Sequence, residues 1–148
     1  MNTMGFCVKR VRPGAALPQR ATSGSAGYDL RACLEEEVTI LPGQTVTIPT
    51  GLAIDLGSPD RAAFIFARSG LGIKHGVVPG NCVGVIDSDY RGEILVGLHN
   101  RSDTPYTIVP GDRIAQMILL PVLTPAVEEV DALEDSDRGA GGFGSTGR

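Results

Sequence analysis

The chain ends in a glycine-rich segment, residues 138–148, whose side chains are suited to binding a nucleotide. Five of these residues are glycines, and they surround Phe143, with Arg138 before it and Ser145 after it. Closely spaced glycines let successive backbone N–H groups converge on phosphate oxygens. Phe143 offers a face on which a base can stack, and Arg138 offers a planar fork for a phosphate. Composition alone nevertheless favours a solvated terminus without a site.

A second candidate segment, Ala-Arg-Ser-Gly-Leu-Gly at residues 67–72, directly follows an apolar run. Arg68, Ser69 and Gly70 bring a guanidinium, a hydroxyl and an unobstructed backbone N–H to one point, which predicts an oxyanion or phosphate clamp. An ordinary exit from a strand into a turn explains the same residues equally well when they are taken alone. His75, close by in a polar turn, is interpreted as a surface residue without a chemical role.

Residues 84–92, Gly-Val-Ile-Asp-Ser-Asp-Tyr-Arg-Gly, form the third candidate. Asp87 lies where an apolar strand ends, a position in which a carboxylate can be partly desolvated and serve as a general base. Together with residues 94–98 the segment predicts a hairpin that could close around a flat ligand, and Tyr90 is expected to face that pocket. An Asp-rich turn capped by its own side chains is the commoner explanation for such a segment alone.

Two further polar residues interrupt apolar strands. Asp29 lies in Gly-Tyr-Asp-Leu-Arg-Ala, and a buried Asp is costly unless it has a partner or holds a hydrated cation. Gln116 lies in Gly-Asp-Arg-Ile-Ala-Gln, where a turn opens another buried strand. Each of the two is, by itself, more typical of structure than of function.

The elements that must position these residues are predicted to be β-strands. Pro-Gly pairs begin at positions 13, 42, 79 and 110, and each indicates a turn. Residues 38–40 and 46–48 predict a hairpin around Pro42-Gly43, residues 62–67 predict an interior strand, and residues 114–120 favour a strand over a helix. Because no segment has a sustained helical stripe, we expect an all-β sandwich, barrel or jelly roll.

Composition limits the class of protein. A chain of 148 residues with 42% hydrophobic and 20% charged residues suits one globular domain. The net charge of −4 argues against a nucleic-acid partner, and no apolar run is long enough for a membrane span or a secretory signal. The three cysteines lack metal-site spacing and predict reduced, buried side chains in a cytoplasmic protein. We expect one folded domain over residues 1–134 and a flexible arm over residues 135–148, since the arm cannot bury enough apolar surface to fold alone.

Taken together, the five segments closely resemble the five motifs of the trimeric dUTPase family in their order and in their amino-acid sequence: AGYDLRA, ARSGLG, NCVGVIDSDYRG, GDRIAQMIL and RGAGGFGSTG. The resemblance runs from residue 6 to residue 148, and five motifs in this order are far more specific than any one of them. The one departure is Ala67, where the family commonly has Pro. That residue shapes the end of the strand and carries no chemistry.

The resemblance implies a jelly-roll β-barrel and a homotrimer in which three chains share each active site. Motif three would come from one chain, motifs one, two and four from a second, and the glycine-rich tail from a third. Uracil would bind to backbone groups around Val85, Ile86 and Leu95, with the Asn81 amide adding specificity. Tyr90 would pack under the deoxyribose and leave no space for the 2′-hydroxyl of UTP.

The resemblance also implies a mechanism for converting dUTP to dUMP and pyrophosphate. Asp87 would activate the water that attacks the α-phosphorus. Gln116, Arg68, Ser69 and Gly70 would hold phosphates and help position that water. The reaction keeps uracil out of DNA and supplies dUMP for dTMP synthesis.

The remaining implied roles belong to a cofactor and to the tail. Mg²⁺ would sit on the triphosphate and on waters, with Asp29 holding one of those waters. Arg138 would contact the γ-phosphate, and Phe143, Gly144 and Ser145 would close over the nucleotide.

Two other functions compete with this interpretation. A dCTP deaminase has a similar fold and trimer, but it would need a catalytic carboxylate at the base, and it lacks the glycine-rich tail. A regulatory nucleotide-binding module without turnover would be expected to lose Asp87 or Arg138, and both are present.

Overall fold

The computed structural model describes residues 5–145 and 147. Within these residues the chain folds into eleven β-strands and one short π-helix, η1 (Gly70–Lys74). The strands are β1 (Cys7–Arg10), β2 (Tyr28–Arg31), β3 (Val38–Ile40), β4 (Thr45–Pro49), β5 (Leu52–Asp55), β6 (Arg61–Phe66), β7 (Val77–Pro79), β8 (Gly84–Ile86), β9 (Leu95–Asn100), β10 (Tyr106–Ile108) and β11 (Arg113–Pro121). The prediction of an all-β protein is confirmed.

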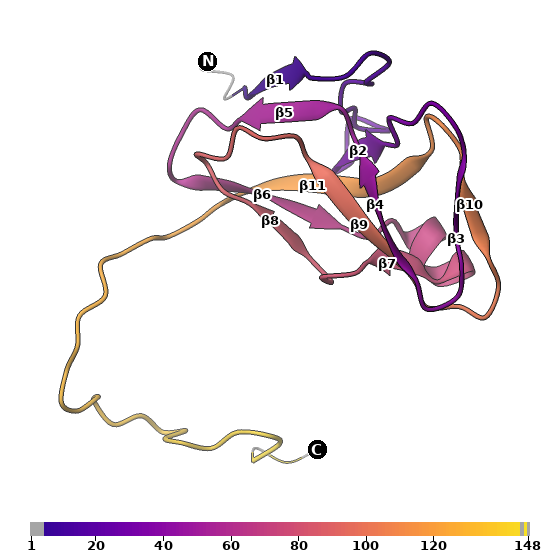
Figure 1. Ribbon diagram of the computed structural model, residues 1–148. Helices are drawn as coiled ribbons and strands as arrows, with labels where there is room; N and C mark the ends of the chain where they lie inside the picture. Colours follow the sequence, from indigo (N-terminus) through magenta and orange to yellow (C-terminus); the bar gives the residue numbers. More distant parts are fainter. Residues whose placement is uncertain (1–4, 146, 148) are drawn as a thin grey trace.

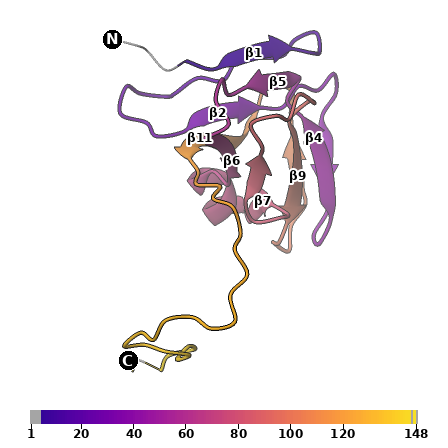
Figure 2. The same ribbon diagram turned by 90° about the vertical axis from the view of Figure 1, so that its left-hand side faces the viewer.

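The strands pair antiparallel throughout, in four sheets (Figures 1 and 2). One sheet has the order β2-β11-β6-β8 and another has the order β4-β9-β7, while β1-β5 and β10-β3 form separate pairs. The interior strand expected over residues 62–67 is confirmed, because β6 lies between β11 and β8. The strand preferred over a helix at residues 114–120 is confirmed as β11.

The two predicted hairpins are wrong. The chain does turn at Pro42-Gly43, but β3 pairs with β10 and β4 pairs with β9. In the same way, β8 pairs with β6, whereas β9 pairs with β4 and β7. A turn sets the direction of the chain, but the partner of each strand is chosen by the apolar surface that the pairing buries. Ile40 and Ile48, on the two sides of the first turn, are both fully buried in their separate sheets.

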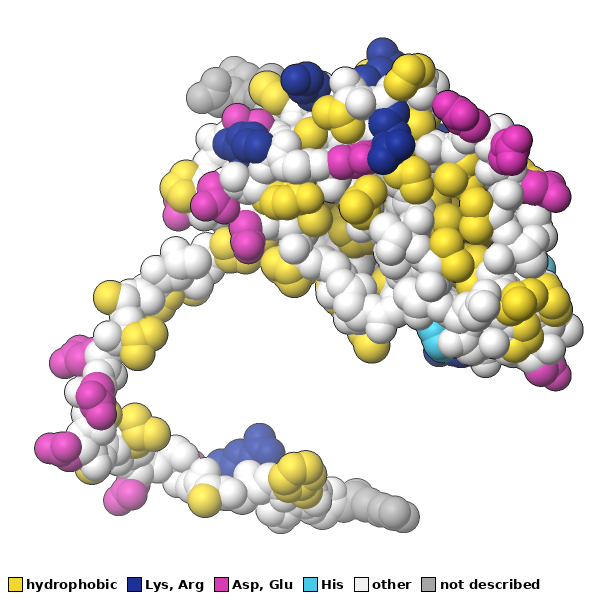
Figure 3. Space-filling view, viewed as in Figure 1, with side chains coloured by type: hydrophobic (Ala, Val, Ile, Leu, Met, Phe, Trp, Pro, Cys, Tyr) yellow, Lys and Arg dark blue, Asp and Glu magenta, His cyan; other side chains and the backbone are white. Residues whose placement is uncertain are grey.

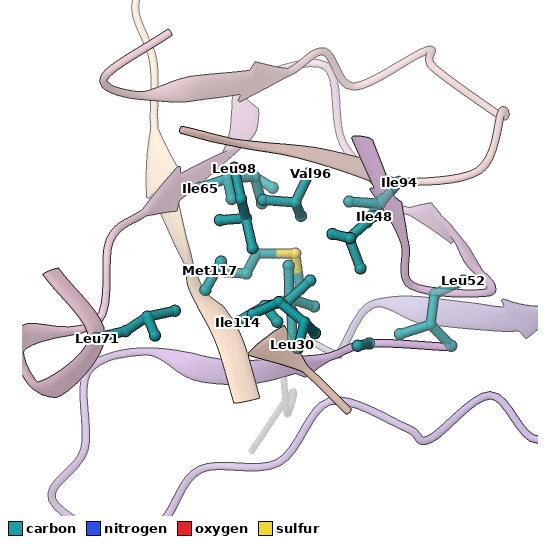
Figure 4. Packing of buried hydrophobic residues seen from close by; sticks show 14 of the residues in the cluster. Leu30, Ile48, Leu52, Ile65, Leu71, Ile94, Val96, Leu98, Ile114 and Met117 are labelled. Atoms are coloured by element: carbon teal, nitrogen blue, oxygen red, sulfur yellow. The ribbon is translucent and has the colours of Figure 1, made fainter. Parts of the chain in front are cut away.

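The core is aliphatic, as a chain without Trp requires. Leu30, Ile48, Leu98, Ile114 and Met117 are almost completely buried and converge from β2, β4, β9 and β11 (Figure 4). A buried amide joins this core to the loops, since Asn100 donates from Nδ2 to the carbonyls of Ile40 and Thr104, at 2.9 and 2.7 Å. These contacts hold the sheets that carry the candidate residues in fixed relative positions.

The cysteines and the C-terminal segment can also be compared with what was expected from the sequence. Cys7 and Cys82 are exposed and Cys33 is half-buried, so the expected burial of the cysteines is wrong for the first two. Beyond β11 the chain leaves the body of the molecule as an extended segment, drawn from orange to yellow in Figure 1. None of the helices in the part of the chain described here has the length and apolarity needed to cross a membrane.

Candidate active site

The four residues expected to bind the base lie together. Asn81, Val85, Ile86 and Leu95 line one cavity of about 330 Å³, which we call the base cavity. Its other lining residues are Thr45, Ile65, Pro79, Gly80, Gly84, Val96 and Gly97. The cavity forms where β8 and β9 run in different sheets and do not pair with each other.

The base cavity suits a flat, partly polar ligand. Val85 and Leu95 are 57% and 50% exposed, although large aliphatic side chains are usually buried. As β8 is the outer strand of its sheet, one edge of its backbone has no neighbouring strand in that sheet. Gly84 allows this part of the wall to pack closely, because a Cβ there would lie 3.1 Å from the Cβ of Ile65. The cavity therefore combines apolar faces with backbone groups at an edge.

A second group of predicted residues meets at the ends of three neighbouring strands. Asp29, Arg68, Ser69 and Gln116 line a cavity of about 270 Å³, which we call the phosphate cavity, together with Ala21, Ser25, Ala26 and Gly27. The strand register explains the meeting, since Gln116 of β11 lies opposite Asp29 of β2 on one side and opposite Phe66 of β6 on the other. Residues far apart in sequence thus become neighbours across a single sheet.

Asp29 has two arginine partners. Its Oδ1 accepts a hydrogen bond from Arg68 Nε at 3.1 Å, and its Oδ2 accepts one from Arg113 Nη1 at 3.3 Å. The Asp29 side chain is only 16% exposed, so these partners compensate for the loss of water. Of the two explanations for a buried Asp, the structure shows the ion-pair partner. Arg68 lines the cavity and Arg113 lies beside it, so these two guanidinium groups and the one carboxylate together carry a net positive charge, which suits a phosphate.

Gln116 is held in a single orientation by its surroundings. Its Nε2 donates to the carbonyl of Ala67 at 2.9 Å. On the other side, a Cβ at Gly27 would lie 2.7 Å from Oε1 of Gln116, so a larger residue there would displace the Gln116 amide. Ala67 contributes its backbone carbonyl to this contact.

Gly70 is the first residue of η1. One expectation from the sequence was an ordinary turn after Arg68 and Ser69, and the structure has this short helix instead. Gly70 and Arg68 line a third cavity of about 280 Å³, together with Lys74, His75 and Arg113 among others. His75 packs against Tyr106, with ring centroids 4.8 Å apart. Burial raises the pKa of the Tyr106 hydroxyl, so this ring stays neutral at ordinary pH.

Asp87 and Tyr90 line neither the base cavity nor the phosphate cavity in the single chain. Asp87 is exposed, so the partial desolvation expected at the end of its strand is not found in the single chain. Tyr90 was expected to face the pocket, but its hydroxyl instead donates to the carbonyl of Glu93 at 2.9 Å, and the residue is 42% exposed. A single chain therefore does not bring all the predicted site residues together.

The glycine-rich tail is extended and exposed. Arg138 donates from Nε to the carbonyl of Gly141 at 2.8 Å, and Phe143 is fully exposed. Gly144 and Ser145 also contact only the tail in the hydrogen bonds of the described residues. In Figure 3 the tail stands away from the body and carries apolar and acidic side chains along its length. The four predicted tail residues are thus together, but far from both cavities.

The family model for dUTPases matches residues 14–147. The chain belongs to the dUTPase family. It is 58% identical over 139 residues to the deoxyuridine 5′-triphosphate nucleotidohydrolase of Hahella chejuensis, covering 94% of this chain and 91% of the relative. It is 54% identical over 132 residues to the enzyme of the same name from Paraburkholderia xenovorans, with 89% of each chain covered. The chain is therefore a nucleotide-hydrolysing enzyme of the dUTPase class.

A solved dUTPase has the same fold. A mutant dUTPase of Staphylococcus bacteriophage 80alpha, solved with dUpNHpp, superposes with a TM-score of 0.89 at 27% identity, covering 99% of this chain and 100% of the phage chain. The family resemblance drawn from the five motifs is confirmed.

Three residues of this dUTPase are important in the structure and were not singled out as candidates from the sequence. Arg113 joins the phosphate cavity through Asp29, Gly27 makes room for Gln116, and Glu93 holds the loop that carries Tyr90. Arg113 and Gly27 lie inside two of the family motifs, so motif membership was a usable signal. Nothing in the sequence around Glu93 indicates its partners, which lie 42 and 81 residues away.

Proposed function

We propose that this enzyme converts dUTP to dUMP and pyrophosphate at a site that joins the base cavity, the phosphate cavity and the glycine-rich tail. This reaction keeps uracil out of DNA and supplies dUMP for dTMP synthesis. The observation that carries the proposal is the base cavity, in which all four residues expected to bind uracil meet. The family membership supports dUTP as the substrate.

Selection of uracil would depend on hydrogen bonds at the edge of the base. The Asn81 amide and the backbone around Val85, Ile86 and Leu95 would pair with the polar edge of uracil, and the apolar walls would cover its faces. Cytosine presents the opposite donor and acceptor at that edge, so its binding would leave buried polar groups unpaired. Among the described residues, the lining of this cavity has no carboxylate. The deaminase alternative requires one at the base, so this lining disfavours it.

The chemistry would be a single displacement at the α-phosphorus. A water oxygen bonds to that phosphorus, the bond to the bridging oxygen breaks, and pyrophosphate leaves. Asp87 accepts the proton of the attacking water as a general base. Arg68, Ser69, Gly70 and Gln116 bind phosphate oxygens and help to align the water.

The residues of the phosphate cavity fit an ion that arrives on the triphosphate better than a resident metal. No group of three or more His, Cys, Asp or Glu side chains gathers within residues 5–145 and 147, and Asp29 is already paired with two arginines. Mg²⁺ keeps most of its waters and typically binds through substrate phosphates and one or two carboxylates. When bound, it would shield the triphosphate charge. A triphosphate would compete for Arg68 and Arg113, which would leave Asp29 free to hold a metal-bound water.

We also propose that the working enzyme is a homotrimer in which three chains complete each site. In the single chain, the base cavity and the phosphate cavity have no lining residue in common. Asp87, Tyr90 and the tail lie outside both cavities. A second and a third chain would supply the missing groups, and cyclic symmetry makes this arrangement repeat three times.

Release of pyrophosphate and of ammonia from dUTP, UTP, dCTP and dTTP, each with Mg²⁺, tests the function. We expect pyrophosphate from dUTP at a rate far above the other three and no ammonia from dCTP. Ammonia from dCTP would support the deaminase alternative. Binding of dUTP without any product would support a regulatory module, and either result would overturn the proposal.

A further inference from the structure

The ring of Tyr90 is held by hydrogen bonding more than by packing. It is 42% exposed, and its hydroxyl donates to the Glu93 carbonyl at 2.9 Å. The ring lies directly over Gly92, where an added Cβ would be 2.4 Å from the Tyr90 hydroxyl oxygen. The position of the ring therefore follows the position of residue 93.

The carboxylate of Glu93 is itself fixed by two donors from distant parts of the chain. Its Oε1 accepts from Arg12 Nε at 2.6 Å and from the backbone N–H of Gly51 at 2.9 Å. The Glu93 side chain is 17% exposed. The hydrogen bond from Arg12 is the main cause of a lowered Glu93 pKa, so the carboxylate stays ionised at neutral pH. We call Arg12, Gly51 and Glu93 the carboxylate junction.

The junction rests on a rigid backbone. Gly51 has a φ of +70°, and a Cβ there would lie 2.7 Å from the Cβ of Ala15 and 2.9 Å from the Sγ of Cys33, so only glycine fits. Residue 94 is anchored beside it, because Ile94 donates to the Leu52 carbonyl at 2.8 Å and accepts from the Thr50 hydroxyl at 2.7 Å. Because the N–H of Ile94 belongs to the same peptide group as the Glu93 carbonyl, these bonds act together with the carboxylate contacts to fix that carbonyl.

A second ion pair on the same loop provides a contrast. Arg91 lies 3.2 Å from Asp55, but the two side chains are 55% and 49% exposed. Exposed pairs of this kind contribute little, because water and salt screen them. In Figure 3 the Lys and Arg side chains gather along the top of the molecule, with acidic side chains close to some of them. Of the two pairs, the one in the junction has the better-shielded carboxylate, since Glu93 is 17% exposed and Asp55 is 49% exposed.

We propose that Glu93 is a positioning residue that determines sugar selection by holding the ring of Tyr90 in place. The inference rests on the proposed function, in which Tyr90 excludes the 2′-hydroxyl of the substrate. Arg12 and Gly51 fix the Glu93 carboxylate, Glu93 fixes its own carbonyl, and that carbonyl fixes the Tyr90 hydroxyl. A loose ring leaves room for a ribose, so damage to the junction relaxes selection against UTP without removing a group that contacts the reacting atoms.

The test compares kcat/KM for UTP with kcat/KM for dUTP in the full-length protein. Glu93→Ala is expected to raise the UTP-to-dUTP ratio about fivefold, the size of effect expected from one lost neutral hydrogen bond. Tyr90→Phe should raise it similarly, and the double variant should exceed neither single one by much, because both remove the same constraint. Glu93→Gln should retain most of the selectivity, since its amide oxygen can still accept from Gly51. Asp55→Asn, which breaks the exposed pair, is the matched control and should leave the ratio unchanged.

The outcomes separate the two proposals. If the wild type hydrolyses no dUTP, the proposed function fails before the junction is tested. If it hydrolyses dUTP selectively and folded Glu93→Ala keeps the wild-type ratio, the role of Glu93 is wrong. Should Glu93→Ala fail to fold, Arg12→Ala at the half-exposed end of the junction replaces it. An unchanged ratio in folded Arg12→Ala together with Tyr90→Phe would then overturn the inference.

Discussion

At the scale of single residues, Asp87 has the most demanding of the proposed roles and the least support from its own chain. A general base needs a position within hydrogen-bonding distance of its water, and a carboxylate that exchanges protons readily is usually shielded from bulk solvent. Asp87 is exposed in the single chain and lies beyond the end of β8. Its environment during catalysis must therefore come from the nucleotide or from another chain.

Replacing Asp87 by Asn is expected to reduce dUTP turnover by about 10²–10⁴-fold, because an amide cannot accept the proton of the water. The melting temperature should not change, since the side chain has no partner to lose in the hydrogen bonds and ion pairs of the described chain. Steady-state pyrophosphate release and thermal unfolding would measure the two effects. Asp89→Asn, two residues along the same loop, is the control and should remain active. Near-normal turnover in Asp87→Asn would exclude Asp87 as the base.

At the scale of elements, the meeting of β2, β6 and β11 builds the phosphate cavity. The antiparallel register places Gln116 beside both Asp29 and Phe66. Arg68 follows shortly after the end of β6. Gly27, just before β2, packs closely against the side chain of Gln116.

Gly27→Ala is expected to displace the Gln116 amide, because the new methyl carbon would start 2.7 Å from Oε1. A misplacement of about 1 Å can cost up to about 10²-fold in rate, so we expect a clear loss of kcat with a correctly folded protein. Gly24→Ala is the matched control, since nothing lies within 4 Å of a Cβ there. Equal kcat values for the two variants would show that Gln116 does not need its present orientation.

The carboxylate junction predicts a pH-dependent contribution to stability. The hydrogen bond from Arg12 lowers the pKa of Glu93 from its ordinary value of 4.5, so the folded state favours the ionised carboxylate. The stabilisation is therefore fully present above the unfolded-state pKa and is lost as the pH falls through the lower folded-state pKa. The difference in melting temperature between wild type and Glu93→Gln should be largest near neutral pH and should shrink below about pH 4.5. A difference that stays constant down to acid unfolding would contradict an ionised, hydrogen-bonded Glu93.

At the scale of the whole molecule, the tail and the body are nearly independent in the single chain. Deleting residues 138–148 is expected to leave the melting temperature unchanged, because the described residues of this segment bury no core and bond only to one another and to Ser136. Turnover should fall severely, since stacking of Phe143 on the base alone would be worth about 1–3 kcal/mol. Trypsin should cut after Arg138 more slowly when a non-hydrolysable dUTP analogue and Mg²⁺ are bound. Full activity after truncation, or no protection by the analogue, would identify the tail as a solvated terminus.

Mixing two inactive variants would test whether chains share a site. Asp87→Asn with an intact tail and the tail-deleted chain with an intact Asp87 should each be inactive. Unfolding and refolding the two together should restore part of the activity, because some mixed trimers would combine an intact Asp87 from one chain with an intact tail from another. Sedimentation of the wild type should give a trimer. A fully active monomer, or mixed trimers without recovered activity, would contradict shared sites.

The sequence by itself determined the family, the all-β class and four of the residues that line the base cavity. Alternating apolar residues and Pro-Gly turns indicate strands, because side chains alternate between the two faces of a sheet. The resemblance of the five motifs to the family implied Asn81, Val85, Ile86 and Leu95 as base-binding residues, and these four do line one cavity.

Only the tertiary structure decided which strands pair and how the charged residues are satisfied. Alternation indicates that a segment is a strand but does not name its partner, which is why the neighbouring strands around Pro42-Gly43 were wrongly expected to pair with each other. The same limit applies to Asp29, whose arginine partners lie 39 and 84 residues away, and to Glu93 with Arg12. Contacts between distant residues depend on the packing of the whole chain, so local sequence contains no direct signal for them.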